Sequence, residues 1–168
     1  PVRTKQGCPF SCVYCTYRRN GSARLRLAEP VEVAGAVRRL AASGLRDIEF
    51  VDDVFNAPKA HALAVCEALS RDGRRARLQS LDLNPYAFDD ELVTAMRRAG
   101  FVGMGLTVES AADAVLEGLG KGFTSRAVHQ AADVVKRNSI PCAWIFLLGG
   151  PGETRETVRE TMGYAART

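Results

Sequence analysis

Short apolar runs alternate with helix-like patterns along the whole chain. Runs typical of strands fall at residues 2–5, 48–51, 77–81, 101–108 and 140–148, and the last run is the most apolar. After each run, apolar residues recur at the spacing of one helical face. Strands that alternate with helices pair in parallel, so the pattern predicts an α/β fold with a parallel sheet.

The helical stretches have recognisable ends. Pro30 suits a first helical position, and that helix should stop before Gly44. Asn56 is expected to cap the next helix, and a third should run from Asp89 to Gly100. Further helices are expected at residues 111–119, at 125–137 and from 154 to the end.

Five strand–helix units predict a partial (β/α) barrel or an open doubly wound sheet, and both bind ligands where strands end. The chemistry-bearing residues follow the first, second, fourth and fifth strands. They are Cys8, Cys12, Cys15, Asp52, Asp53, Glu109, Ser110 and the turn at 149–153. We therefore expect all of them on one shared rim.

Composition adds few constraints. The 168 residues are 46% hydrophobic and 25% charged, which is ordinary for a globular domain. The net charge of +4 gives no strong argument for nucleic acid, and the basic stretch 71–77 is interpreted as a solvated helix end and loop. No membrane span or signal peptide is seen, and five cysteines without secretory context favour the reducing cytoplasm. The start at Pro1 suggests an excerpt of a longer protein.

Three of those cysteines, Cys8, Cys12 and Cys15, form the segment GCPFSCVYC. Their spacing places three thiolates on one short loop. A structural zinc site normally takes four protein ligands, whereas a 4Fe–4S cluster held by three thiolates keeps one iron free. A zinc site that borrows a distant fourth ligand remains the alternative.

The other thiols and imidazoles do not stand at zinc-finger spacing. His61, Cys66 and His129 fall in predicted helices away from the expected rim, and Cys142 is early in its strand. Cys66 and Cys142 are interpreted as small core residues.

The segment GCPFSCVYC after a first strand resembles the radical SAM (S-adenosylmethionine) superfamily. FVDD, GLTVES, LGKG and GGPGET then follow in the expected order. The resemblance implies one core domain over residues 1–168, a partial (β/α)6 TIM-like barrel whose last strand is missing. It also implies a 4Fe–4S cluster on the three cysteines, whose open iron binds SAM. The reduced cluster would then cleave SAM to a 5′-deoxyadenosyl radical, or SAM would serve as a methyl donor.

The resemblance also implies contacts with SAM. Tyr14 matches a position that packs near the adenine, although an ordinary aromatic residue is the alternative. Asp52 and Asp53 match a Gly-Gly-Glu segment that receives the SAM amino group; FVDD departs from that segment, and solvated turn acids are the alternative.

Further contacts are implied at the ends of the last two strands. Glu109 and Ser110 match a segment that hydrogen-bonds the ribose or the methionine part of SAM, and Ser110 could instead cap the next helix. Lys121 would neutralise the SAM carboxylate, or would be an exposed lysine. Leu148 and Gly150, with Glu153 after them, match the segment that holds the adenine.

The combined motifs resemble most the subgroup that follows a cobalamin-binding domain. This implies a methyltransferase acting on an unactivated carbon, with the corrin module expected before Pro1. The alternatives are a cobalamin-independent oxidoreductase, a methylthiotransferase or a zinc-binding structural module. A small-molecule or peptide substrate and an electron donor such as flavodoxin or ferredoxin are expected, and no nucleic acid.

Overall fold

A four-stranded parallel sheet organises the computed structural model, which describes residues 1–16, 25–72 and 76–168. Its strands lie in the order β3 (Asp47–Phe50), β4 (Arg77–Leu83), β5 (Phe101–Glu109) and β6 (Cys142–Phe146). Neighbouring strands are consecutive in the chain and pair in parallel throughout. The predicted α/β fold with a parallel sheet is confirmed.

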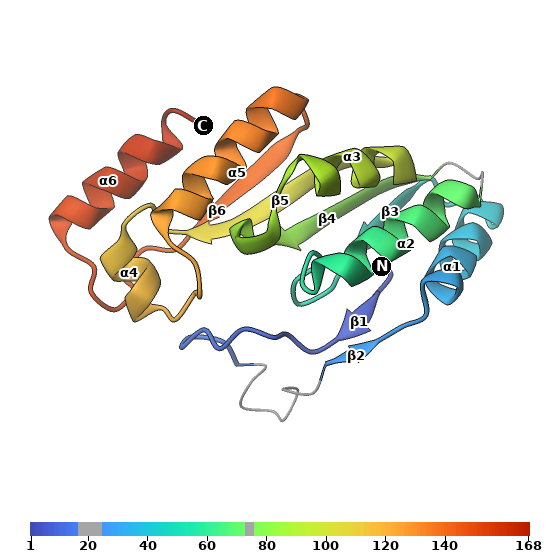
Figure 1. The fold of residues 1–168 in the computed structure, drawn as a ribbon, viewed down its shortest axis with the longest axis horizontal. Helices are drawn as coiled ribbons and strands as arrows, with labels where there is room; N and C mark the ends of the chain where they lie inside the picture. The colour runs from blue at the N-terminus through green and yellow to red at the C-terminus, as the bar shows by residue number, and fades with distance from the viewer. Residues whose placement is uncertain (17–24, 73–75) are drawn as a thin grey trace.

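The helices follow the strands in chain order along one side of this sheet, from α1 to α6 (Figure 1). They are α1 (Pro30–Ala42), α2 (Lys59–Arg71), α3 (Asp90–Ala99), α4 (Asp113–Gly118), α5 (Ser125–Asn138) and α6 (Arg155–Ala165), with a 3-10 turn, η2, at Pro85–Ala87. The first five residues of β4 show the alternation of a strand with one covered face, since Leu78 and Ser80 are buried while Arg77, Gln79 and Leu81 are exposed.

The core between the sheet and the helices is centred on three aromatic rings. Phe50 and Phe55 are fully buried, and the ring centre of Phe101 lies 5.3 Å from both. Burying a phenylalanine side chain stabilises the fold by about 1.5–3 kcal/mol, and a well-oriented aromatic pair adds roughly 1 kcal/mol. Phe50 ends β3, so this packing also fixes the strand end that leads to Asp52.

The first predicted strand differs from expectation. Val2 makes one isolated parallel bridge to Phe50, and the chain then leaves the sheet. Strand β1 (Lys5–Gln6) pairs antiparallel with β2 (Arg26–Leu27). The reason is a side chain: the backbone N–H groups of Thr4 and Lys5 donate to the Asp52 carboxylate, so they cannot continue a ladder beside β3.

The predicted cap of α2 is also wrong. The helix begins at Lys59, after Pro58, and Asn56 is instead buried against the next loop. Its amide donates to the Asn84 carbonyl over 2.8 Å and accepts from the Asn84 N–H over 2.8 Å. This reciprocal pair fixes the loops after β3 and β4 to one another. The expected start of α3 is correct, because the Asp89 side chain accepts from the Leu92 N–H.

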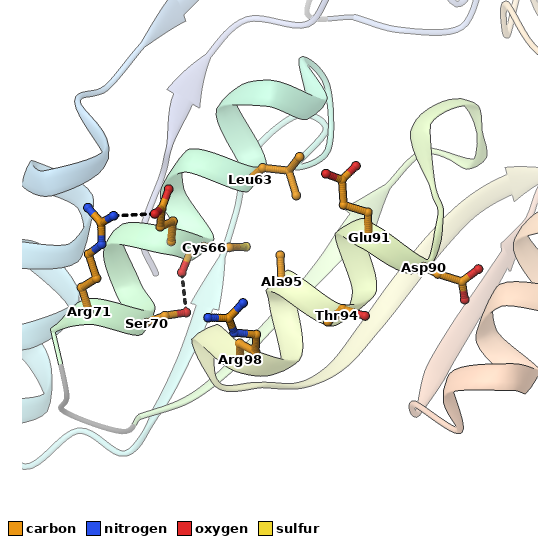
Figure 2. A pocket seen from close by; sticks show the side chains of 10 residues that line it. Leu63, Cys66, Ser70, Arg71, Asp90, Glu91, Thr94, Ala95 and Arg98 are labelled. Carbon is orange, nitrogen blue, oxygen red and sulfur yellow. Dashed lines mark hydrogen bonds and ion pairs between the residues drawn. The ribbon is translucent and has the colours of Figure 1, made fainter.

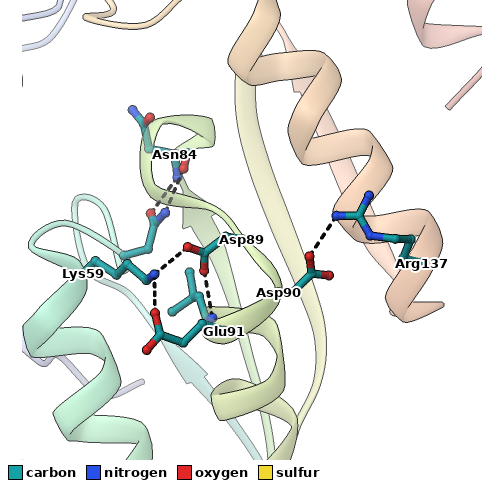
Figure 3. Close-up of polar contacts among 8 residues, drawn as sticks. Lys59, Asn84, Asp89, Asp90, Glu91 and Arg137 are labelled. Atoms are coloured by element: carbon teal, nitrogen blue, oxygen red, sulfur yellow. Dashed lines mark hydrogen bonds and ion pairs between the residues drawn. The ribbon is translucent and has the colours of Figure 1, made fainter.

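Ion pairs link α3 to both of its neighbouring helices (Figure 3). The Lys59 ammonium at the start of α2 contacts Asp89 at 2.5 Å and Glu91 at 2.6 Å, and these hydrogen bonds raise the pKa of Lys59. Arg137, in the last turn of α5, reaches Asp90 at 2.8 Å. These pairs are mostly exposed, so each contributes little, about 0–1 kcal/mol.

Within the described ranges, every helix is too short or too polar to cross a bilayer.

Candidate functional site

The cysteine loop follows β1 and lies against the segment after α4. The thiols of Cys8, Cys12 and Cys15 are free and half-buried, and a turn closes where the Cys15 N–H donates to the Cys12 carbonyl at 3.2 Å. The Val13 N–H donates to the Leu119 carbonyl at 3.0 Å. A backbone hydrogen bond thus docks the middle of the loop onto a distant part of the chain.

The Cys8 thiol lies near other acidic groups. Burial raises the pKa of the Cys8 thiol, a backbone hydrogen bond at Phe10 lowers it, and the charges of Cys12, Asp53 and Cys15 raise it further. Three thiolates on one loop would be favoured by a positively charged centre beside them. A 4Fe–4S cluster supplies that charge and is held by thiolates at short spacing, so the donor set fits such a group. Across the described residues, no three or more His, Cys, Asp or Glu side chains converge closely enough for a single metal ion.

Three of the predicted SAM contacts meet in one hydrogen-bonded cluster. The Tyr14 hydroxyl donates to Glu109 Oε1 at 2.6 Å. Lys121 Nζ donates to the same Glu109 oxygen at 3.2 Å and to the Tyr14 hydroxyl at 3.0 Å. We call Tyr14, Glu109 and Lys121 the rim triad. It joins the cysteine loop, the end of β5 and the segment after α4.

The surroundings of the Tyr14 hydroxyl raise its pKa. Burial raises the pKa of the Tyr14 hydroxyl, and the hydrogen bond and charge of Glu109 raise it further, with a smaller effect from Cys12. Tyr14 therefore stays protonated, and its hydroxyl donates a hydrogen bond to the Glu109 carboxylate. The residue is nonetheless 44% exposed, so it can contact a ligand on the rim.

Glu109 owes its direction to an unusual backbone. Its φ is +67°, and among the described residues only Ser139 shares a positive φ without being glycine. The register between β5 and β6 shifts at this point, and the Glu109 carbonyl accepts from the Leu147 N–H at 2.9 Å. Such a conformation costs on the order of 1–3 kcal/mol and persists where the surroundings impose it. It turns the carboxylate toward Tyr14 and Lys121.

Lys121 is buried, so its interpretation as an exposed lysine is wrong. Only 3% of the residue is exposed, and its ammonium lies 5.6 Å from the ring centre of Tyr14 and 5.7 Å from that of Phe123. A buried lysine needs a partner, and Glu109 is that partner. The two side chains thus form an ion pair of 3.2 Å beside the cysteine loop.

The LGKG segment, residues 119–122, connects the cysteine loop to the turn after β6. A Cβ at Gly120 would lie 3.3 Å from the Ser11 carbonyl oxygen, and the φ of Gly120 is +65°. A Cβ at Gly118 would lie only 2.5 Å from the Pro151 carbonyl oxygen. Glycine is therefore required where these loops touch, because a side chain would push them apart.

The Asp52 carboxylate is hydrogen-bonded to residues at the start of the chain. Its Oδ1 accepts from the N–H groups of Thr4 at 2.8 Å and Lys5 at 3.0 Å, and its Oδ2 accepts from the Thr4 hydroxyl at 3.0 Å. The residue is 2% exposed. Asp52 thus anchors the segment that leads into the cysteines, while its neighbour Asp53 stays half-buried and acts electrostatically on Cys8.

The remaining predicted residues have different environments. The Ser110 hydroxyl is buried 2.9 Å from the Thr161 hydroxyl and accepts from the Ala112 N–H, so it braces the chain before α4, whose N-cap is Ala112. Leu148 is 55% exposed. Glu153 accepts from the Gly149 N–H, and Gly150 packs against Leu119. The hydrogen bonds place Tyr14, Glu109 and Lys121 together at the end of β5, and a shared rim for the whole set stays a prediction.

Sequence reasoning missed the buried contacts of Thr4 and Lys5, the two residues that bind Asp52. Lys5 is 4% exposed, and its ammonium donates to the Phe55 carbonyl at 2.8 Å. His61, expected away from the rim, is buried with its Nε2 3.0 Å from the Thr4 carbonyl oxygen. These contacts join residues about 50 positions apart. The available signal was weak: a lysine and a threonine stood in a run otherwise interpreted as a strand.

A separate groove of about 770 Å³ lies between α2 and α3 on the helical layer (Figure 2). It is lined by side chains of both signs, including Glu67, Arg71, Asp90, Glu91 and Arg98. None of the residues of the cysteine loop or the rim triad lines it. The large groove and the candidate site are therefore different places on the molecule.

The sequence of the chain is similar to those of two proteins named as methyltransferases. The chain is 30% identical to an uncharacterized methyltransferase of Pyrococcus horikoshii, over 99% of this chain and 36% of the relative. It is 25% identical to tryptophan 2-C-methyltransferase of Streptomyces laurentii, over 95% of this chain and 29% of that protein. The chain thus spans about a third of the length of these relatives.

Solved structures show the same fold. The cobalamin- and [4Fe-4S]-bound radical S-adenosylmethionine methyltransferase TsrM from Kitasatospora setae superimposes with a TM-score of 0.90 at 25% identity, covering 99% of this chain and 32% of TsrM. OxsB, a cobalamin-dependent radical enzyme, shares the fold with a TM-score of 0.77 at 18% identity, covering 97% of this chain and 26% of OxsB. The Radical SAM superfamily profile matches residues 2–165, and the chain belongs to that superfamily.

Proposed function

We propose that this chain is the cluster- and SAM-binding core of a cobalamin-dependent radical SAM methyltransferase that acts on an unactivated carbon. One observation supports this best: the cysteine loop and the rim triad meet on the rim of a sheet whose fold follows TsrM with a TM-score of 0.90. Relatives named as methyltransferases support the type of reaction.

Cys8, Cys12 and Cys15 would hold a 4Fe–4S cluster, because they are the thiols that share one loop on the rim. When bound, the cluster supplies an open iron for the amino and carboxylate groups of SAM and an electron for cleavage of a carbon–sulfur bond. The protein's own part would be to carry three thiolates on one loop. The turn between Cys12 and Cys15 and the hydrogen bond from Val13 to Leu119 would fix that loop.

The rim triad would bind the sugar and the amino acid part of SAM. The Glu109 carboxylate can accept from two vicinal hydroxyls of a ribose, and it lies 3.2 Å from the Lys121 ammonium. Lys121 can turn one of its donors to the SAM carboxylate. Tyr14 would lie along the adenine with its exposed ring face.

Other groups would complete the SAM site. Asp53 and the backbone carbonyls at the end of β3 would accept from the SAM ammonium group; Asp52, whose oxygens already accept three donors, would orient them. Leu148 and Gly150 would border the adenine, and Ser110 would support the strand end from behind. The exposed Leu148 side chain would cover apolar ring surface on binding.

The rest of the proposal concerns partners of the whole protein. Cobalamin would be bound mainly by a domain outside this segment; TsrM, which was solved with cobalamin bound, is matched by this chain over 32% of its length. A small molecule is the favoured substrate, since TsrM was also solved with tryptophan. An electron donor such as flavodoxin or ferredoxin would reduce the cluster in the cytoplasm, where five free thiols would persist.

Anaerobic reconstitution of the full-length protein tests this proposal. We expect about four irons per chain, a brown colour that bleaches with dithionite, and methyl transfer that depends on added cobalamin. S-adenosylhomocysteine and 5′-deoxyadenosine should be measured together, because they report methyl donation and radical formation separately. A colourless protein that holds one zinc ion would exclude the proposal.

A methylthiotransferase is the second candidate, because the chain is also 30% identical to a tRNA-2-methylthio-N(6)-dimethylallyladenosine synthase of Chloroflexus aurantiacus, over 98% of this chain and 37% of that enzyme. Such an enzyme inserts sulfur and needs a second cluster. Iron well above four per chain, with no response to cobalamin, would favour this second candidate.

A further inference from the structure

Lys5 is a buried cation to which the proposed chemistry assigns no role. It stands three residues before Cys8 and is 4% exposed. Its ammonium donates to the Phe55 carbonyl at 2.8 Å and to the Thr4 hydroxyl at 3.3 Å, and it lies 5.6 Å from the centre of the Phe55 ring. A charged group so far from water is kept only where specific partners compensate it.

The compensating charge is Asp52. The Thr4 hydroxyl accepts from Lys5 and donates to Asp52 Oδ2 at 3.0 Å, so one hydroxyl links the two charges. Asp52 is 2% exposed and also accepts the N–H groups of Thr4 and Lys5. We call Thr4, Lys5 and Asp52 the buried clasp. Because little water screens these charges, each acts over a longer range than a surface charge.

The buried clasp lies close to the cysteine loop along the chain. Three residues of chain span at most about 11 Å, so the Cα atoms of Lys5 and Cys8 lie within roughly that distance of one another. Asp52 accepts from the Lys5 N–H at 3.0 Å and is therefore in the same neighbourhood. Burial, the largest effect, lowers the pKa of Lys5, and the charges of Asp52, Cys8 and Asp53 raise it. An electron added to an iron–sulfur cluster at Cys8 would make that centre more negative. A nearby cation stabilises the reduced form and a nearby anion destabilises it, and such charges set the potentials of iron–sulfur centres.

We propose that Lys5 and Asp52 set the reduction potential of the cluster on Cys8, Cys12 and Cys15 from opposite sides, Lys5 raising it and Asp52 lowering it. The inference rests on the proposed cluster and adds a role for residues that touch neither SAM nor the thiols. Both residues are positioning residues in this scheme. They hold β1, which leads into the cysteine loop, and they would shift the free energy of adding an electron to the cluster.

The experiment compares Lys5→Gln and Asp52→Asn with the wild-type full-length protein after anaerobic reconstitution. Glutamine keeps a donor for the Phe55 carbonyl, and asparagine keeps an acceptor for the Thr4 and Lys5 N–H groups. Iron content and a dithionite titration followed by electron paramagnetic resonance give the midpoint potential. We expect about a tenfold fall in the ratio of reduced to oxidised cluster at fixed potential for Lys5→Gln, about 59 mV, and a rise of similar size for Asp52→Asn.

Opposite signs distinguish an electrostatic role from mere damage, which would move both variants the same way. Lys5→Arg keeps the charge and should restore the wild-type potential. Equal signs, unchanged potentials, or loss of the cluster from all three variants would overturn the inference. A wild-type protein that takes up no iron–sulfur cluster would instead overturn the proposed function, so the two failures are distinguishable.

Discussion

The rim triad and the buried clasp are both small charge networks beside the cysteine loop, yet they are built for different tasks. In the rim triad, Glu109 and Lys121 are 6% and 3% exposed, but Tyr14 beside them is 44% exposed and Glu109 has a positive φ. In the buried clasp, Asp52 is 2% exposed and accepts three hydrogen bonds from the chain itself. The two networks bury their charges equally, and they differ in the exposed tyrosine and the positive φ of the rim triad.

The comparison also explains why two adjacent acids differ. Asp52 and Asp53 both lie in the loop after β3, but they differ in burial and in partners. Asp52 lies inside the clasp, whereas Asp53 is half-buried near Cys8. Only the second retains a carboxylate free to receive a ligand's ammonium group.

The largest expected effect is on the cysteine loop that both networks support. Cys12→Ala should abolish cluster-dependent cleavage of SAM, because three thiolates leave no spare ligand for the cluster. Iron content and SAM turnover of the reconstituted protein measure this. Cys142→Ala, a change to a thiol in β6, should keep the iron content of the wild type. Wild-type turnover in Cys12→Ala would contradict the assignment of this loop.

Breaking the anchor should cost stability. Asp52→Ala leaves the Lys5 ammonium buried without its partner and removes three hydrogen bonds, so we expect a loss of about 3–5 kcal/mol in the free energy of unfolding. Urea denaturation of the apoprotein measures it. Asp53→Ala is the matched control and should change the free energy of unfolding by less than about 1 kcal/mol. Similar losses in both variants would mean that the clasp is not the anchor.

Changing the rim triad should affect ligand binding and leave the anchor intact. Glu109→Gln removes the charge that would accept the ribose hydroxyls, so we expect SAM affinity of the cluster-loaded protein to fall about tenfold, or about 1.4 kcal/mol. Calorimetry measures the affinity, and iron analysis should be unchanged. Glu117→Gln, on the exposed side of α4, is the control. An unchanged affinity in Glu109→Gln would remove Glu109 from the SAM site.

The smallest expected effect is on the pH dependence of stability, and it comes from Asp82 in β4. Burial raises the pKa of Asp82, and the charges of Glu49, Asp52 and Asp53 raise it further. A raised folded-state pKa means that the native state holds its proton more tightly than the unfolded chain. Stability therefore falls as pH rises from the unfolded value through the folded one.

Asp82→Asn removes the titrating carboxyl group, so the variant does not lose this stability at neutral pH. Because Asp82 is only half-buried, we expect a gain below about 1 kcal/mol at pH 7, which disappears as the pH falls below the folded pKa. Urea midpoints at pH 7 and pH 4 test it. A stabilising effect that grows at acidic pH would show that the sign of this shift is wrong.

The strands and helices were predictable because their signals are local. The alternation in β4, the Asp89 cap and the proline at the start of α1 each depend on residues a few positions apart. The first strand and the Asn56 cap were predicted wrongly because distant partners decided them. Asp52 took the N–H groups of Thr4 and Lys5, and Asn84 took the amide of Asn56.

The sequence by itself determined the spacing of the three cysteines, the order of the strand–helix units and the placement of the motifs at strand ends. The tertiary structure alone decided which charges face the rim and which are buried. It made Lys121 a buried partner of Glu109, and Asp52 an anchor for Thr4 and Lys5. The reason is physical: burial and pairing depend on segments about 12 to 50 residues apart, and no local pattern records those contacts.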